Sequence, residues 1–530
     1  MSEYKATYNL AKMKIWFNKN ERGLFSLYVL MIIYLLYNTG IVSDDFSFIN
    51  DKYKFSTFFD SIKNGNQYLG RPVFKYFFSM FYYFIDINQF FLIDILKTIQ
   101  IIIIFYMITR FFSIYINASS AMMVAFLFIF FPTHDSTTYW YLEVSLSLGI
   151  GLYLYAYYLV SNNRFIFAGI SSFLASFVSY GSPPIAFTLF ILCLLKKSYK
   201  QGLILFLPNV VYAGYFIFVT KFLNQDVQRI PNEINIFPLL KQYILQVGTF
   251  IDATIGPSFF LKLYYSILEN DLVSIILAVI FIVGYVLISR AKEEKEKTLI
   301  DKNLLIVLTI LILTSCGIFA ITGGYPQLAF NLGNRTTIYG SLLFSYLLVT
   351  LPIPENARKV ILFLILVSMM GISTHWKNLN QHQQRIIENI RMNPDLASYQ
   401  GIDPIYVTGN QYSKMGPFSN IEFLSENWVV ESILKLSVHE KMRAKTLNKR
   451  LIWENGILID KKYKNLRYPI EDYINVYDSE NNKLMKISAQ NINSYIRSMP
   501  HNKRHWIQMI DNEQINALLL KLMPRLKYAF

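Results

Sequence analysis

The stretch Gly23–Val42 reads GLFSLYVLMIIYLLYNTGIV and contains no charged residue over 20 positions. About 20 apolar residues in a helix are enough to cross the hydrocarbon core of a bilayer. Five Lys or Arg residues and two Glu residues precede this run. No small-residue cleavage site follows it, so the run predicts an uncleaved first transmembrane helix with a cytoplasmic N-terminus rather than a signal peptide.

The sequence downstream repeats this apolar pattern. Ten further apolar runs follow, at roughly 88–109, 117–132, 141–160, 165–181, 184–195, 201–220, 271–289, 303–321, 337–351 and 360–375. Residues 1–375 are therefore predicted to form an α-helical polytopic membrane domain with about 11 transmembrane helices.

The composition of the chain excludes several classes of protein. Hydrophobic residues make up 53% of its 530 residues and charged residues 16%, whereas soluble domains contain about 25% charged residues. The 43 Phe, 38 Tyr and 6 Trp residues exclude a disordered chain. The two cysteines, Cys193 and Cys316, lie inside apolar runs, which excludes a disulfide framework or a cysteine metal cluster. In a membrane protein, the net charge of +15 indicates anionic lipids or phosphates as partners rather than nucleic acid.

The loop charges predict the orientation of the chain. With the N-terminus in the cytoplasm, the loops at Arg110, Arg164, 196–200, 290–302 and 352–359 are cytoplasmic, and they contain most of the Lys and Arg found between spans. The predicted outside segments are 43–87, 133–140, 182–183, 221–270, 322–336 and everything after about 376. Within them, Phe55–Asp86 and the stretch between Pro238 and Pro257 are predicted to be amphipathic helices lying in the membrane interface.

The tail, residues 376–530, changes to a polar and charged composition. Strand-like runs at Ile405–Thr408 and Leu451–Ile459 alternate with helical runs at Glu426–Val438 and Asn512–Met523. We expect a small soluble C-terminal domain of the α/β or α+β class on the outer side of the membrane. The sequence has no internal repeat, and the lack of two matching halves argues against a secondary transporter.

An acidic pair, Asp44-Asp45, follows the first span directly. Its simplest interpretation is a polar boundary that ends the helix. The alternative is a general base, with a metal ligand beside it, because a carboxylate among aromatic side chains and near another carboxylate has a raised pKa and can accept a hydroxyl proton.

Two arginines are predicted at the same outer face. Arg71 belongs to Gly70-Arg71-Pro72, and Arg335 follows the Gly323–Pro326 segment at the start of a span. A guanidinium at this position can bind a phosphate through two hydrogen bonds. The alternatives are contact of Arg71 with lipid headgroups and a role for Arg335 as an interface anchor.

The loop after Pro132 contains three further candidates. His134 and Asp135 could hold a divalent metal together with the acidic pair, although adjacent residues rarely both face one metal, and loop polarity also explains His134. Glu143 lies inside an apolar span, where a carboxylate indicates a functional position. By contrast, Asp94 and Lys97 are one helical turn apart and are expected to neutralise each other.

The order of these features resembles the GT-C superfamily of polytopic membrane glycosyltransferases. The first helix, the acidic pair, Gly70-Arg71-Pro72, the aromatic spans, Asn334-Arg335-Thr336 and a C-terminal soluble domain follow one another as in that superfamily. The Gly-Arg-Pro motif and the span containing Tyr180 are similar to the bacterial and phage GtrII-type O-antigen glucosyltransferases. The resemblance covers about residues 15–375.

This resemblance implies transfer of a hexose, with glucose favoured, from a polyprenyl-phosphate-sugar donor to a glycan acceptor such as O-antigen. It implies a multi-pass protein of the bacterial inner membrane with its C-terminal domain in the periplasm. Asp44 or Asp45 would deprotonate the acceptor, and Arg71 and Arg335 would hold the donor phosphate. His134, Asp135 and Glu143 remain candidates for acceptor or metal contacts.

No cofactor follows from the resemblance. A divalent metal, Mg or Mn, stays open, because some members of the superfamily use one and others do not. Two other functions also stay open: a flippase or transporter for lipid-linked sugars, which predicts charges along a path inside the spans, and an O-antigen polymerase or ligase, which favours a large late outside loop with paired arginines.

Overall fold

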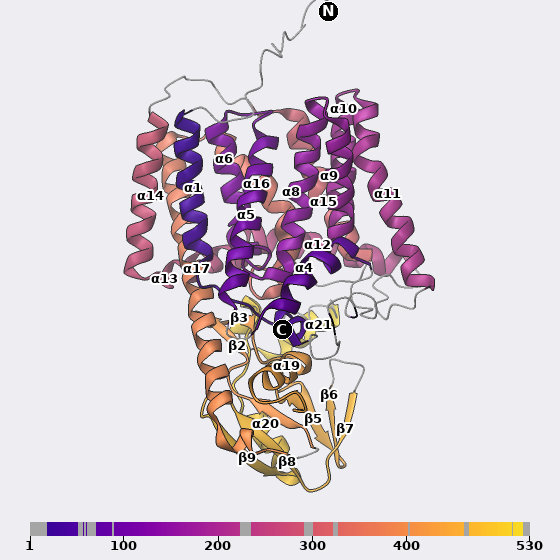
Figure 1. The fold of residues 1–530 in the computed structure, drawn as a ribbon, viewed down its shortest axis with the longest axis vertical. Coiled ribbons are helices and arrows are strands. Elements are labelled where there is room, and N and C mark those ends of the chain that lie inside the picture. Colours follow the sequence, from indigo (N-terminus) through magenta and orange to yellow (C-terminus); the bar gives the residue numbers. More distant parts are fainter. Residues whose placement is uncertain are drawn as a thin grey trace, which may run out of the picture.

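The computed structural model describes residues 19–50, 57, 60, 70–86, 89–222, 235–290, 300–321, 327–400, 403–460, 466–510 and 512–522. The chain forms a layer of roughly parallel helices with the C-terminal domain on one side of it (Figure 1). Each predicted apolar run contains one helix of this layer. They are α1 Lys19–Leu36, α5 Phe91–Phe112, α6 Ala118–Ile129, α8 Tyr141–Ser161, α9 Phe165–Val178, α10 Ser182–Leu195, α11 Tyr199–Phe222, α14 Leu272–Arg290, α15 Lys302–Ile321, α16 Ile338–Thr350 and α17 Glu355–Met392.

Several helices have the length and apolarity of membrane spans. Six segments meet both criteria among the described residues: 91–112, 141–161, 199–222, 236–268, 302–321 and 355–392. Four shorter apolar helices, in 118–129, 165–178, 182–195 and 272–288, accompany them. The chain is thus mostly helical with membrane character, but these criteria do not reproduce the predicted count of about 11 spans.

The segments predicted to share the outer face lie together. They form α2 Asp45–Asn50, α4 Pro72–Phe84, the short 3₁₀ helix η2 Pro132–His134, α7 Ser136–Tyr139, α12 Ile236–Ile255, α13 Pro257–Leu268 and the 3₁₀ helix η3 Leu332–Thr337. Of these, α4, α12 and α13 are at the tail side of the layer (Figure 1), and the shorter helices contact them, one another or the tail. Most of residues 55–69, the first part of the predicted interfacial segment, and all of Gly323–Pro326 lie outside the described residues. Segment 236–268, predicted as an outside loop, is long and apolar enough to span by composition, but it is divided into α12 and α13 at Gly256.

The tail is a mixed α/β domain, as predicted. Its main sheet has the order β4-β1-β8-β9, in which β1 is parallel to β4 and β8, and β8 is antiparallel to β9. A hairpin β2-β3 and a three-stranded antiparallel sheet β5-β6-β7 complete it. The strands are β1 Ile405–Thr408, β2 Tyr412–Met415, β3 Phe418–Glu422, β4 Ala444–Thr446, β5 Leu451–Glu454, β6 Ile457–Asp460, β7 Leu466–Pro469, β8 Tyr473–Asp478 and β9 Lys483–Ser488.

The helices of the tail surround these sheets. They are α18 Pro394–Ala397, α19 Asn427–Ser437, η4 Ala489–Asn491, α20 Ile492–Ser498, η5 Trp506–Ile510 and α21 Glu513–Leu522. The predicted strand at 451–459 is a hairpin, because Asn455 and Gly456 adopt positive φ angles of 49° and 78° between β5 and β6.

The layer of helices formed by the described part of residues 19–375, called the membrane layer below, and the tail share one hydrophobic core. Phe46 of α2 packs against Phe423, which follows β3, with ring centroids 6.3 Å apart. α17 joins the two parts without a break, since it runs through residue 375, the predicted domain boundary. The tail is therefore fixed against the face on which the candidate site residues lie.

Candidate active site

A buried ion pair holds the segment between α1 and the acidic pair. Lys97 and Asp94 of α5 approach to 3.0 Å, as their spacing predicted. The amide of Gly40 donates to Asp94 Oδ1 at 3.0 Å, and Lys97 Nζ donates to the carbonyl of Gly40 at 3.0 Å. Gly40 has a φ of +66°, and a Cβ there would meet the side chain of Asn380. These contacts determine where Asp44 emerges from the membrane layer.

The two members of the acidic pair have different surroundings. Asp45 is fully buried, and its carboxylate accepts hydrogen bonds from the Val42 amide at 3.0 Å and from the Tyr82 hydroxyl. Burial raises the pKa of Asp45 to about 7, although both hydrogen bonds oppose this rise. Asp45 therefore connects α2 to α4 inside the protein.

Asp44 faces the opposite way, toward the tail. Its Oδ1 accepts a hydrogen bond of 2.6 Å from the indole N–H of Trp428 in α19. Burial raises the pKa of Asp44, and the hydrogen bond from Trp428 and the positive charge of Arg335 partly offset this effect. A carboxylate of raised pKa beside an open space is suited to accept a proton.

That space is a cavity of about 820 Å³ between the membrane layer and the tail. Its membrane side includes Ser43, Asp44, Trp140, Asn331 and Arg335, and its tail side includes Glu422, Trp428, Asn448, Lys449, Arg450 and Lys503. Such a volume is within the range of small-molecule sites. Aromatic, amide and charged side chains together can contact both the ring faces and the hydroxyls of a sugar.

Arg335, the second arginine predicted at this face, lines the cavity. Its Nη1 is 3.6 Å from Glu143 Oε1, and its guanidinium lies 5.4 Å from the ring centroid of Trp140. The side chain of Arg335 retains 25% exposure. Glu143 is thus an ion-pair partner that holds Arg335 in place, which explains a carboxylate at the start of an apolar helix.

Arg71 does not line this cavity. Its guanidinium lies over the rings of Phe74 and Tyr180, at 4.5 and 4.8 Å from their centroids. The residue is only 6% exposed, and the carbonyl of the preceding Gly70 accepts a hydrogen bond from Tyr212 at 3.0 Å. The structure brings Arg71 and Tyr180 together, but it places them apart from the cavity wall that contains Asp44 and Arg335.

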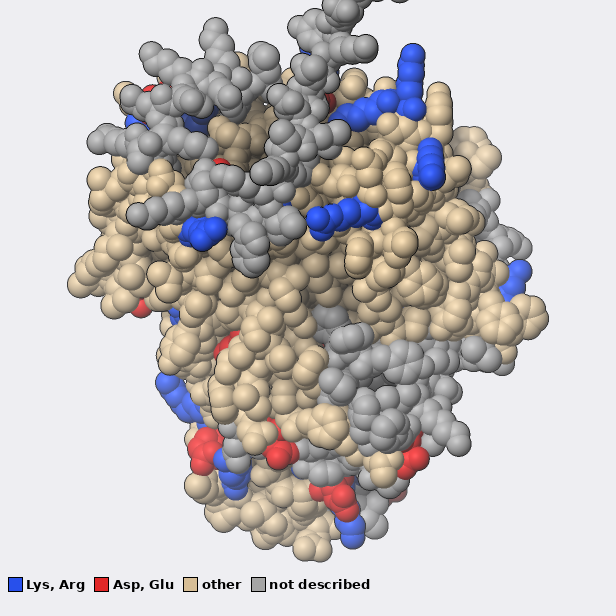
Figure 2. All heavy atoms as spheres, turned by 45° about the horizontal axis from the view of Figure 1, so that its top comes forward, with Lys and Arg blue, Asp and Glu red and all other residues tan. Residues whose placement is uncertain are grey.

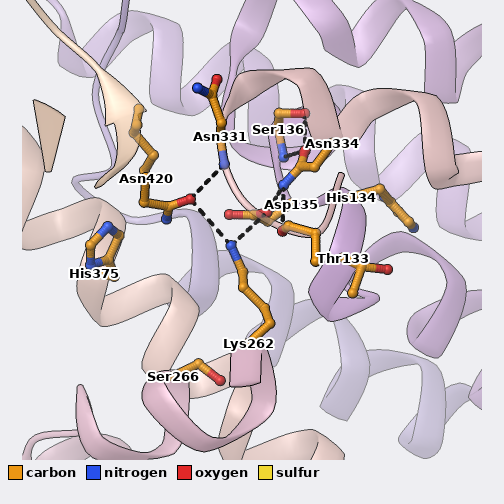
Figure 3. A network of polar contacts seen from close by, with 12 residues as sticks. Thr133, His134, Asp135, Ser136, Lys262, Ser266, Asn331, Asn334, His375 and Asn420 are labelled. Atoms are coloured by element: carbon orange, nitrogen blue, oxygen red, sulfur yellow. Dashed lines mark hydrogen bonds and ion pairs between the residues drawn. The ribbon is translucent and has the colours of Figure 1, made fainter. Parts of the chain in front are cut away.

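Asp135 is the centre of a buried polar network (Figure 3). Its carboxylate pairs with Lys262 of α13 at 3.3 Å and accepts hydrogen bonds from Asn334 and, at 2.9 Å, from the Trp376 indole. Lys262 Nζ also lies 3.5 Å from Asn420 Oδ1 in β3. The carboxylate already has three donors, so its environment does not fit a metal ligand.

His134 has no role in this network. Its Nδ1 lies 2.8 Å from Thr137 Oγ1, and burial lowers the pKa of His134 to about 4. Among the described residues, no group of three His, Cys, Asp or Glu side chains is close enough to hold a metal ion. The described residues therefore do not bring His134 and Asp135 together with the acidic pair as a metal site, and Glu143 pairs with Arg335 instead.

Sequence reasoning did not identify Trp428 or Lys262. Lys262 is a single basic residue in the apolar helix α13, and a charge in such a position is a signal that could have found it. Trp428 has no comparable local signal, since its importance depends on a contact with Asp44 across 384 positions of sequence.

Comparison with known proteins adds no assignment at this point. No protein-family model matches the chain, and no curated protein matches it.

Proposed function

We propose that the protein is a membrane glycosyltransferase that moves a hexose, with glucose favoured, from a polyprenyl-phosphate-sugar donor to a glycan acceptor such as O-antigen. The observation that supports this proposal is the shared cavity. Asp44 and Arg335 lie far apart in the sequence, yet both line the same cavity, together with Trp140 and Trp428.

Each group has a defined part in the proposed reaction. Asp44 accepts the proton of the acceptor hydroxyl while its oxygen attacks the anomeric carbon of the sugar. The bond from that carbon to the phosphate oxygen breaks, and the polyprenyl phosphate leaves with the bonding electrons. Arg335 stabilises the phosphate as its charge increases, which is the electrostatic contribution expected for a charged leaving group.

The surface charges support a periplasmic location for this reaction. Several Lys and Arg side chains lie at the end of the helical layer opposite the tail, whereas the tail shows Asp and Glu mixed with further Lys and Arg (Figure 2). Basic residues favour the cytoplasmic side of bacterial membrane proteins. The tail and the cavity would then face the periplasm.

The test is transfer by the purified full-length protein, with defined polyprenyl-phosphate sugars and an O-antigen acceptor. Asp44→Asn should reduce the rate by about a hundred- to ten-thousand-fold, the usual cost of losing a general base. Asp395→Asn, an exposed aspartate of α18, is the matched control and should leave the rate unchanged.

Two results would contradict the proposal. If Asp44→Asn transfers sugar at the wild-type rate, Asp44 is not the general base. A wild-type protein that transfers no sugar from any polyprenyl-phosphate donor, but moves the lipid-linked sugar across vesicle membranes, would favour a flippase instead.

A further inference from the structure

We propose that Trp428 is a positioning residue for Asp44, so that the C-terminal domain supplies part of the catalytic site. The inference rests on the proposed function, in which Asp44 is the base. It follows from the 2.6 Å hydrogen bond that the Trp428 indole donates to Asp44 Oδ1. Among the described residues, Trp428 is the side chain that the structure shows donating to this carboxylate.

The indole is presented by a rigid part of the tail. Trp428 is the second residue of α19, and the following Val429 and Val430 are buried in the shared core. Glu426, just before the helix, accepts two hydrogen bonds of 3.1 Å from Arg450. Asn427 accepts one of 2.9 Å from the Thr446 amide. These anchors restrict the start of α19 and therefore the direction of the indole N–H.

The proposed base directly precedes α2, and the helix that positions it contacts α2. α19 packs against α2, which begins at Asp45. Trp428 itself keeps 42% exposure and lines the cavity. The hydrogen bond anchors Oδ1 of Asp44, and a carboxylate with one anchored oxygen has a defined orientation in the cavity that it lines.

The charged groups around Asp44 explain why a neutral donor is useful there. Arg335 of η3 stabilises the ionised carboxylate, while Glu422 of β3 and Glu143 of α8 oppose it, and Asp45 is adjacent in the chain. Arg335 is paired with Glu143 and is assigned to the donor phosphate. The indole N–H holds the carboxylate without adding a positive charge that would compete for that phosphate.

The test compares two Trp→Phe variants of the full-length protein. Trp428→Phe removes the N–H donor and keeps an aromatic ring. Trp453→Phe is the matched control, because Trp453 lies on β5 of the same domain and its buried indole nitrogen has no hydrogen-bond partner among the described residues. The rate of transfer is measured against pH and against donor concentration.

Trp428→Phe should lower kcat about tenfold, the effect of losing one hydrogen bond to a charged group, with little change in the KM for donor. The hydrogen bond from Trp428 lowers the pKa of Asp44. Its removal lets that pKa rise, and the acidic limb of the rate profile should move to higher pH. Trp428→Gln, which retains an N–H donor without the ring, should keep the limb near its wild-type position.

A second readout does not depend on turnover. The infrared carboxyl band that disappears in Asp44→Asn reports the titration of Asp44, and its midpoint should rise in Trp428→Phe but not in Trp453→Phe. If the wild-type protein transfers no sugar, the proposed function fails, and the infrared band alone then tests whether Trp428 donates a hydrogen bond to Asp44. If Trp428→Phe matches Trp453→Phe in rate, pH profile and band, the positioning role is overturned.

Discussion

The substitution Lys262→Met should destabilise the protein strongly, because it leaves a buried carboxylate without its cation. Lys262 is fully buried, and the side chain of its partner Asp135 is only 3% exposed. Methionine is of similar length and apolar, so the change removes the charge without opening a large cavity. Asp135 would retain Asn334 and Trp376 as neutral donors.

The magnitude follows from burial. Removing one partner of a buried ion pair costs roughly 3–5 kcal/mol, which is a large share of the about 5–15 kcal/mol that stabilises a typical protein. Lys359→Met is the internal comparison. Its partner Glu355 lies at 2.6 Å, but the two side chains are 56% and 78% exposed, and exposed pairs contribute about 0–1 kcal/mol.

Denaturant unfolding of both variants in one detergent provides the measurement, with tryptophan fluorescence as the signal. Lys262 also lies near Asn420 of β3, so we expect faster hydrogen exchange in β3 for Lys262→Met. The double variant with Asp135→Asn should recover part of the lost stability, since no charge is left unpaired. Equal unfolding midpoints for Lys262→Met and Lys359→Met would refute the reasoning.

Three further outcomes are expected. Burial gives Asp45 a pKa of about 7 in the folded protein, above its value in the unfolded chain. The free energy of unfolding should therefore fall by on the order of 2–4 kcal/mol as the pH rises from about 4 to 7. Asp45→Asn should abolish this pH dependence in a difference titration, and transfer should persist. Arg335→Lys should weaken donor use, and Arg335→Ala should weaken it more, by about tenfold to a hundredfold. The control Arg391→Lys, in a solvent-accessible ion pair, should leave donor use unchanged. If neither Arg335 variant alters the dependence of the rate on donor concentration, Arg335 is an interface anchor. Single cysteines replacing the exposed Ser161 and Ser398 should react with impermeant reagents from opposite sides of the membrane, and labelling from the same side would contradict the topology.

The sequence predicted the elements well because their signals are local. Each apolar run contains a helix, and Ile405–Thr408 and Glu426–Val438 correspond to β1 and α19. The Asp94–Lys97 pair could also be predicted, since its members are one turn apart in one helix.

The site was harder to predict, because a predicted topology tells on which side of the membrane a residue lies but not how far apart two residues on that side are. Arg71 and Arg335 share the predicted face, yet Arg71 packs on Tyr180 and Arg335 borders the cavity. Asp44 and Asp45 are adjacent, but the backbone turns them toward different neighbours, Trp428 and Tyr82. Contacts between distant segments decide such differences, and no local pattern encodes them.

The unbroken course of α17 limits how substrates reach the cavity. Its 38 residues form one continuous helix that is about 57 Å long. At its end, the side-chain amide of Asn393 donates a hydrogen bond to Asn482 Oδ1, just before β9. A continuous helix across the boundary between the two parts provides no loop within residues 355–392 at which the tail could hinge away. The height of the cavity between the tail and the helices should therefore stay constant, and under the proposed function a lipid-linked donor would enter it sideways from the bilayer.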